Sequence, residues 1–250
     1  MVRGVRSSGS RGRVVAAYEV SALVHAADGW LALTKASMAL SKVLKPKQLD
    51  VVLSDSMVRY ACSPWRSELR SAQEDLAFAK LGFDDVYGAS VSNEWHFAFS
   101  LASPGVSRLM VASPKSLFEL LATNFSRAMP PVVSIKTGLT QALSIHKNAL
   151  QREGWLVNVE DDTVTFASWN PTGWTWVNTV RASVHSPEDL RALLLQELTI
   201  AGVNSSPTQP ISVALNAPML GQRQPVELVG VRWTLLNAVQ ARCAPLEVSA

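Results

Sequence analysis

The residues that could carry chemistry begin with an acidic turn, Glu160, Asp161 and Asp162. The turn lies between residues 155–159 and 163–169, in which apolar and polar side chains alternate as they do in β-strands. A phosphate-binding loop needs glycine so that backbone N–H groups can approach the ligand, and this turn has none. Asp161 and Asp162 could ligate Mg²⁺. The alternative, which we expect, is a solvated hairpin turn, because aspartate favours turns.

The other candidates for catalysis do not form a constellation. Asp55 near Arg59 could be a catalytic acid beside a cation, but a local ion pair or a strand-end turn is the simpler interpretation. No Gly-x-Ser-x-Gly elbow is present for a serine nucleophile. The histidines lack the spacing of a metal site; they are His25, His96, His146 and His185. The sequence therefore predicts no catalytic centre, no metal and no cofactor.

Tryptophans are numerous, and they could form either core or contact surface. Trp169, Trp174 and Trp176 lie close together, and the last two should share one face of a strand because side chains alternate with a period of two. Burial in the core is the first expectation. Exposure would instead make this face a docking surface, because tryptophan is enriched at interfaces.

Composition bounds the class of protein. The chain has 250 residues, 48% of them apolar and 17% charged, which suffices for a sizeable core. The net charge of +3 includes four arginines in residues 1–13, so the rest of the chain is close to neutral. We expect residues 1–13 to be a basic, disordered tail and the body to lack the basic stripe of a nucleic-acid-binding protein. No apolar run reaches the roughly 18 residues of a membrane span.

The two cysteines, Cys62 and Cys243, are far apart and outside any metal-type spacing. We expect free thiols, which suit a reduced compartment.

The elements that must position these residues follow from the hydrophobic periodicity. Strands are predicted at 13–20, 30–34, 49–54, 95–101, 108–112, 132–135, 211–215 and 226–235, with three more from residue 155 to residue 180. Helices are predicted at 67–81 with Gly82 as the cap, at 114–126, at 139–150, and from the Ser186-Pro187 start. The order repeats on either side of residues 151–154. We therefore expect an α/β protein of two similar mixed-sheet halves, 14–151 and 152–250.

Two such halves, together with one particular run, resemble the actin-like ATPase superfamily, which has a ribonuclease H-like fold. Residues 51–65 read Val-Val-Leu-Ser-Asp-Ser-Met-Val-Arg-Tyr-Ala-Cys-Ser-Pro-Trp, and a helix ending Phe-Asp-Asp-Val-Tyr-Gly follows at 83–88. This pattern resembles bacterial proteins related to the pilus-assembly protein PilM and to the cytoplasmic domain of the type II secretion protein GspL. Residues 133–142 resemble the strand and the closing helix of that family's first half. The resemblance spans residues 49–200.

The resemblance also implies where nucleotide chemistry would reside. In active relatives, an Asp-x-Gly turn in the first hairpin of each half grips phosphate. Here the corresponding turns are Ala27-Asp28-Gly29 and the acidic turn at 160–162, and neither matches. The Gly-Gly pair that binds adenosine is also missing; the nearest run is at 218–221. The nucleotide loops are thus degenerate.

The resemblance implies a non-catalytic cytoplasmic scaffold, peripheral to the inner membrane. Its partner would be a membrane-anchored component of a type IV pilus or type II secretion assembly, bound through Tyr60 and Trp65 first and through Trp174 and Trp176 second. The alternatives are an ATP-binding actin-like ATPase with degenerate loops and an unrelated two-lobed binder of a small molecule. The sequence leaves the oligomeric state open.

Overall fold

The computed structural model describes residues 2–8, 14–20, 49–69, 71–88, 91–119, 132–160, 162–202, 210–215 and 233–237. The chain divides into two compact units. The first comprises Met1–Val51, Ser116–Ser134 and Val239–Ala250, and the second comprises Val52–Lys115 and Ile135–Ala238. This division separates compact bodies and does not test internal similarity. The two similar halves, 14–151 and 152–250, therefore remain a prediction.

In the first unit, the chain begins with an antiparallel hairpin. Strand β1 (Val2–Ser8) pairs with β2 (Val14–Val20), from Val2 opposite Val20 to Ser8 opposite Val14. The prediction of a disordered tail is therefore wrong for β1, because the apolar β2 gives this arginine-bearing segment a full ladder of backbone partners. The strand predicted at 13–20 is confirmed. The turn at 27–29 and the strand at 30–34 lie outside the described residues.

The second unit contains a mixed five-stranded sheet in the order β10-β9-β8-β11-β12. Strands β8 (Gly154–Val159), β9 (Thr163–Asn170) and β10 (Gly173–Arg181) form an antiparallel meander. Strand β11 (Ile211–Leu215) runs parallel to β8 and to β12 (Trp233–Asn237). The predicted mixed sheet after residue 154 is confirmed.

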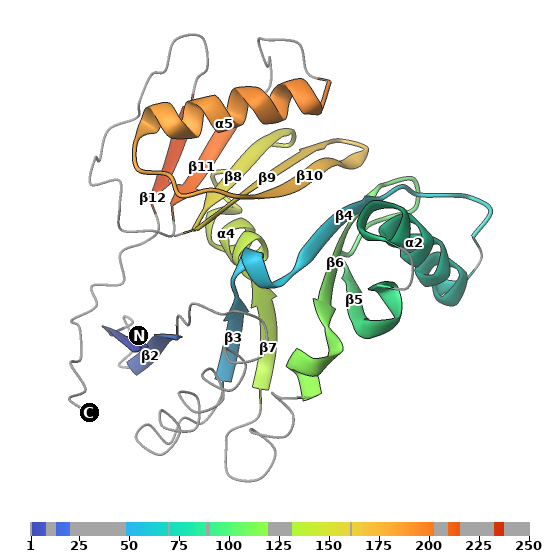
Figure 1. The fold of residues 1–250 in the computed structure, drawn as a ribbon, viewed down its shortest axis with the longest axis horizontal. Helices are drawn as coiled ribbons and strands as arrows, with labels where there is room; N and C mark the ends of the chain where they lie inside the picture. Colours follow the sequence, from blue (N-terminus) through green and yellow to red (C-terminus); the bar gives the residue numbers. More distant parts are fainter. Residues whose placement is uncertain are drawn as a thin grey trace. The chain divides into compact units, whose positions relative to one another are not determined.

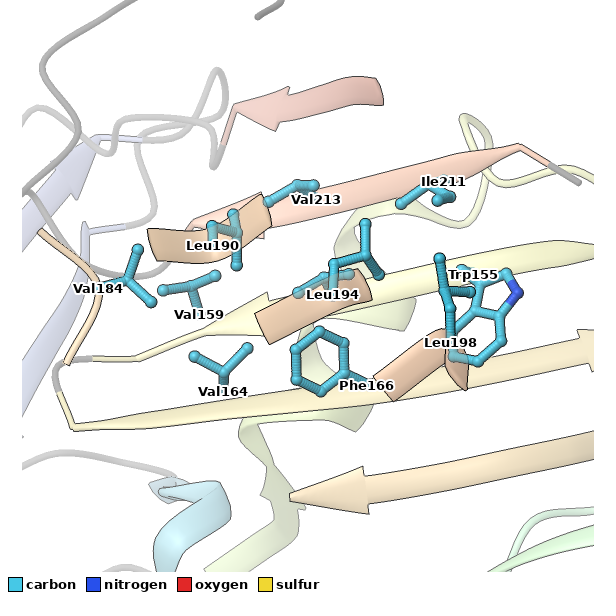
Figure 2. Packing of buried hydrophobic residues seen from close by; sticks show 11 residues of the cluster. Trp155, Val159, Val164, Phe166, Val184, Leu190, Leu194, Leu198, Ile211 and Val213 are labelled. Atoms are coloured by element: carbon cyan, nitrogen blue, oxygen red, sulfur yellow. The ribbon is translucent and has the colours of Figure 1, made fainter. Parts of the chain in front are cut away.

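Helix α5 (Pro187–Ile200) covers one face of this sheet (Figure 1). Ser186 caps it, and a reciprocal capping box joins Ser186 to Asp189, as the sequence predicts. Figure 2 shows the leucines of α5 above the apolar side chains of β8, β9 and β11. The fully buried members of this core include Leu194, Phe166 and Val157. The opposite face of the sheet is also buried, at Leu156, Asn158 and Ala167, and α4 (Gly138–His146) packs against β8.

A three-stranded antiparallel sheet, in the order β4-β6-β5, forms the other part of this unit. Its strands are β4 (Arg59–Ser63), β5 (Trp95–Phe99) and β6 (Arg108–Pro114), and the last two form the predicted hairpin. Helix α2 (Ala72–Tyr87) packs on one face (Figure 1). The short η2 (Val91–Glu94) joins α2 to β5.

Helix α2 runs further than predicted, since Gly82 does not end it. Phe83 is fully buried and its ring contacts those of Tyr87, Trp95 and Phe97, so the next turn of helix gains apolar burial. Gly82 is exposed on the outer side of the helix. The cap is Gly88, whose φ of 104° favours glycine. No helix within the described ranges is long and apolar enough to cross a membrane.

Candidate functional site

The candidate site lies where several chain segments end beside one another. Strand β3 (Leu49–Leu53) leads into the short helix η1 (Asp55–Met57), and its neighbour β7 (Val132–Thr137) leads into α4. The third element that contributes to the site is β8, and the acidic turn begins directly after it, at Glu160. We call Ser54, Asp55, Tyr60, Asn158 and Glu160 the acid cluster.

Asp55 is the centre of the acid cluster and is fully buried. Its Oδ1 accepts hydrogen bonds from the Tyr60 hydroxyl at 2.5 Å and from the Leu139 backbone N–H at 2.9 Å. Its Oδ2 accepts one from the Asn158 amide at 2.8 Å. Leu139 lies in the first turn of α4, where the helix dipole and the free N–H groups stabilise an anion. Asp55 thus serves as the anion at the start of α4.

Tyr60 donates to this carboxylate as a neutral phenol. Burial raises its pKa well above the usual value, and the nearby charge of Asp55 raises it further. The side chain is only 3% exposed, so the prediction of Tyr60 as a docking residue is wrong at this position. The residue is drawn inward because its hydroxyl satisfies a buried acid.

Glu160 is the second acid of the cluster. Its Oε2 accepts hydrogen bonds from the Ser54 hydroxyl at 2.5 Å and from the Asp55 backbone N–H at 3.0 Å. Burial is the main cause that raises the pKa of Glu160 to about 7, and the charge of Asp55 adds to it. The carboxyl group therefore turns inward from the hairpin and titrates near neutral pH.

Gly138, the first residue of α4, allows these acids to lie so close to the helix. A Cβ at this position would stand 1.9 Å from Glu160 Oε1, and 3.1 Å from both Asn158 Nδ2 and Asp55 Oδ1. Thr137 caps the same helix through a reciprocal bond pair with Thr140. The start of α4 is therefore satisfied by the chain's own side chains.

The arrangement is suited to holding segments together rather than to binding phosphate. An incoming phosphate at the start of α4 would meet the carboxylate of Asp55 and the carboxyl group of Glu160, and it would have to displace the bond from Leu139. Within the described ranges, no group of three His, Cys, Asp or Glu residues gathers as a metal site would. Asp162 is exposed and accepts from the Thr163 hydroxyl, while Asp161 lies outside those ranges.

Of the two interpretations predicted for Asp55, the strand-end turn is confirmed, because Asp55 begins η1 just after β3. The ion pair with Arg59 is not formed among the described residues. Arg59 and Tyr60 are neighbours on β4 and point to opposite faces. The guanidinium of Arg59 lies 6.0 Å from the ring centre of Tyr87 and 5.9 Å from that of Trp95, on the α2 side. It donates to its neighbour, the Val58 carbonyl.

The tryptophans of β9 and β10 are divided by a β-bulge. Trp174 pairs with Trp169, whereas Trp176 pairs with Ser168, so one extra residue separates the two registers. The expectation that Trp174 and Trp176 share a face is therefore wrong. Trp176 packs against the α5 core, and its indole N–H is buried without a partner among the described residues. Trp174 lies on the opposite face, where its ring meets that of Trp169 edge-on, with 5.7 Å between the two ring centres.

Trp65 is the exposed member of the predicted set, at 47%. It follows β4, whose last residue, Ser63, pairs with Arg108. Ser107, which directly precedes Arg108, forms an isolated β-bridge with Gly173 at the start of β10. Its hydroxyl donates a hydrogen bond of 2.5 Å to the Trp174 carbonyl. The strand register thus brings the segment of Trp65 towards the segment of Trp174. We call Trp65, Trp169 and Trp174 the tryptophan surface.

Sequence reasoning missed Asn158 and Gly138 as members of the site. A signal for each existed: Asn158 is a lone amide within an apolar strand, and Gly138 begins a helix directly after a capping threonine. Cys62 is a free thiol, and burial raises its pKa to about 12. His25 and Cys243 lie outside the described residues.

No protein-family model matches the sequence, and no curated protein matches it significantly. Solved structures do share its fold. PilM, in a structure of the PilM–PilN type IV pilus biogenesis complex, aligns over 94% of this chain and 88% of that chain, with a TM-score of 0.61 and 12% identity. EpsL is an inner membrane component of the type II secretion system of Vibrio cholerae. Its cytoplasmic domain aligns over 94% of this chain and 84% of that chain, with a TM-score of 0.55 and 13% identity.

A Bacteroides thetaiotaomicron protein with an actin-like ATPase fold aligns over 82% of this chain and 73% of that chain, with a TM-score of 0.48 and 13% identity. The predicted resemblance to PilM and to the cytoplasmic domain of a type II secretion protein, and with it the mixed α/β fold class, is confirmed at the level of the fold. At such identities the likeness concerns the fold alone.

We predict that Gly138→Ala destabilises the protein by about 1–3 kcal/mol, since the new methyl group must displace the Glu160 carboxyl group. Gly82→Ala is the matched control, because nothing lies within 4 Å of its Cβ position in α2. Alanine there should stabilise by about 0.5–1 kcal/mol. Urea unfolding measures the change in the free energy of unfolding for both variants. An equal increase in stability in the two variants would contradict the close packing at Gly138.

We also predict that stability falls as the pH rises from about 5 to about 7. The folded pKa of Glu160, about 7, is above its unfolded value of 4.5, so in this interval only the folded chain keeps the proton. The free energy of unfolding should then decrease by about 1–3 kcal/mol and level off above pH 7. Glu160→Gln should remove most of this slope, whereas the exposed Glu153→Gln should keep it. Urea unfolding at pH values from 5 to 8 measures this dependence. If the free energy of unfolding of Glu160→Gln falls with pH as steeply as that of the wild type, Glu160 is not the group responsible.

Proposed function

We propose that this chain is a non-catalytic, actin-like scaffold that binds a membrane-anchored component of a pilus or secretion assembly. The observation that carries the proposal is the acid cluster. Asp55 occupies the anion position at the start of α4, and Glu160, from the hairpin that grips phosphate in active relatives, turns inward onto Ser54 and Asp55. Both positions where a nucleotide phosphate would gain N–H donors are already used by carboxyl groups.

The fold likeness supports the setting of this role. One similar structure is that of a pilus biogenesis complex, and another is the cytoplasmic domain of an inner membrane secretion component. By analogy, we place the chain at the cytoplasmic face of the inner membrane, as a peripheral protein with no nucleic-acid partner. A shared fold does not by itself establish a shared function, so the proposed role also depends on the acid cluster and on the tryptophan surface.

The tryptophan surface supports the mode of binding. Trp65 is exposed, and the edge-on pair of Trp169 and Trp174 is partly exposed on the face away from α5. Large aromatic side chains with one polar handle are frequent anchors of protein interfaces. Tyr60 and Trp176 are withdrawn from this proposal, because the first is buried and the second packs against the core.

We predict that millimolar ATP with Mg²⁺ leaves the melting temperature unchanged. A ligand at 100 times its dissociation constant would add about 2.7 kcal/mol, or roughly 5–10 °C for a domain of this size. Differential scanning fluorimetry with ATP–Mg²⁺ and with Mg²⁺ alone provides the comparison. A shift, or ATP turnover that disappears in Asp162→Ala, would instead favour an ATP-binding protein with degenerate loops.

We predict that Trp65→Ala and Trp174→Ala each weaken partner binding about thirtyfold, the effect of losing an aromatic anchor worth roughly 2 kcal/mol. The partner is first identified by crosslinking and mass spectrometry in the native host, and affinity is then measured with that protein. Ile200→Ala is the control, because Ile200 is 54% exposed on α5. Recovery of no pilus or secretion component would overturn the proposed partner. Unchanged affinity in both tryptophan variants would overturn the proposed surface.

A further inference from the structure

Strand β5 forms one edge of the three-stranded sheet, opposite to β4 (Figure 1). It therefore has a neighbouring strand, β6, on one side only. Ser100, directly after β5, donates its N–H to the Leu109 carbonyl at 2.9 Å, so Ser100 and every second residue before it point towards β6. The N–H and C=O groups of Trp95, Phe97 and Phe99 therefore point away from the sheet.

No hydrogen bond to these outward groups is found among the described residues. The position of Pro114 agrees with this assignment, because it stands opposite Trp95, at a pair that exchanges no hydrogen bonds with β5. The edge is complete and regular over the whole strand.

The strand lacks the devices that usually protect an edge. Its sequence, Trp-His-Phe-Ala-Phe, has no proline, lysine or acid, and its pairing with β6 shows no bulge. The aromatic side chains lie on the α2 side, where Phe97 packs on Phe83, while His96 and Ala98 are exposed on the other side. Such an edge is a template for another strand.

The pattern is self-complementary about Phe97. In an antiparallel pair of two β5 strands centred there, Phe97 lies opposite its own copy and Trp95 opposite Phe99. All the outward N–H and C=O groups then find partners, and aromatic residues face aromatic residues on the α2 side. On the other side, His96 faces Ala98, so no charged side chain of β5 meets a like charge.

We propose that β5 is the interface of a two-fold symmetric dimer, in which two copies of this chain join their three-stranded sheets edge to edge. The proposal goes beyond the scaffold role and involves a different edge from the tryptophan surface. A five-residue edge buries less surface than a standard interface, so the dimer should be weak and reversible.

The experiment is sedimentation equilibrium of the full chain at physiological salt, over protein concentrations from about 5 to about 500 μM. The variants are Ala98→Lys and Ala98→Glu, because Ala98 is exposed, points away from α2, and lies diagonally opposite its own copy across the two-fold axis. Ala98→Ser is the matched control for a polar change without charge. Circular dichroism of each variant verifies the monomer fold.

We expect wild type and Ala98→Ser to dimerise with the same dissociation constant, and Ala98→Lys and Ala98→Glu to weaken self-association at least tenfold each. An equimolar mixture of the lysine and glutamate variants should recover dimers, because opposite charges then face each other. A wild type that stays monomeric at every concentration overturns the proposal and leaves the edge to another protein. A dimer that neither charge affects, or a mixture that does not recover, places the interface elsewhere.

Discussion

The structure of the second unit depends on one buried charge. Asp55 is fully buried, and an isolated carboxylate in that setting would cost far more free energy than the fold can offset. The charge is acceptable because three donors from three segments converge on it: Tyr60 from β4, Leu139 from α4 and Asn158 from β8. Each donor fixes its own element relative to η1. Removing any one of these donors would leave a buried carboxylate oxygen of Asp55 short of a hydrogen bond. The positions of β4, α4 and β8 therefore depend on one another.

This convergence explains what the sequence could and could not predict. Strands β8 and β9, the hairpin of β5 and β6, and the capping box of α5 rest on neighbouring residues, and the periodicity predicts them. The bonds of Asp55 join residues 84 and 103 positions apart, which no local pattern encodes. The need for Gly138 is likewise invisible in the chain, because only the folded positions of Glu160 and Asn158 exclude a side chain there.

Predictions about side-chain direction failed for a related reason. In a strand, one extra residue moves every following side chain to the other face, and the bulge between Trp174 and Trp176 does this. Tyr60 and Arg59 point to opposite sides of β4, so Asp55 gains the phenol while the guanidinium stacks on aromatic rings. The residue types were suggestive in both cases, but exposure and partner depended on a register that only the assembled sheet determines.

The acid cluster also shows how a helix start can be completed by the chain's own side chains. A helix start needs an acceptor for its free N–H groups, and a ligand phosphate or a side-chain carboxylate can supply it. Here Asp55 bonds Leu139, and Glu160 ties the end of β8 to Ser54 and the Asp55 backbone. The junction is then complete in the absence of any ligand. Because β4 leaves η1 at this junction, the same bonds help fix the direction in which the chain enters the three-stranded sheet. The geometry of this junction is thus set by the chain's own side chains.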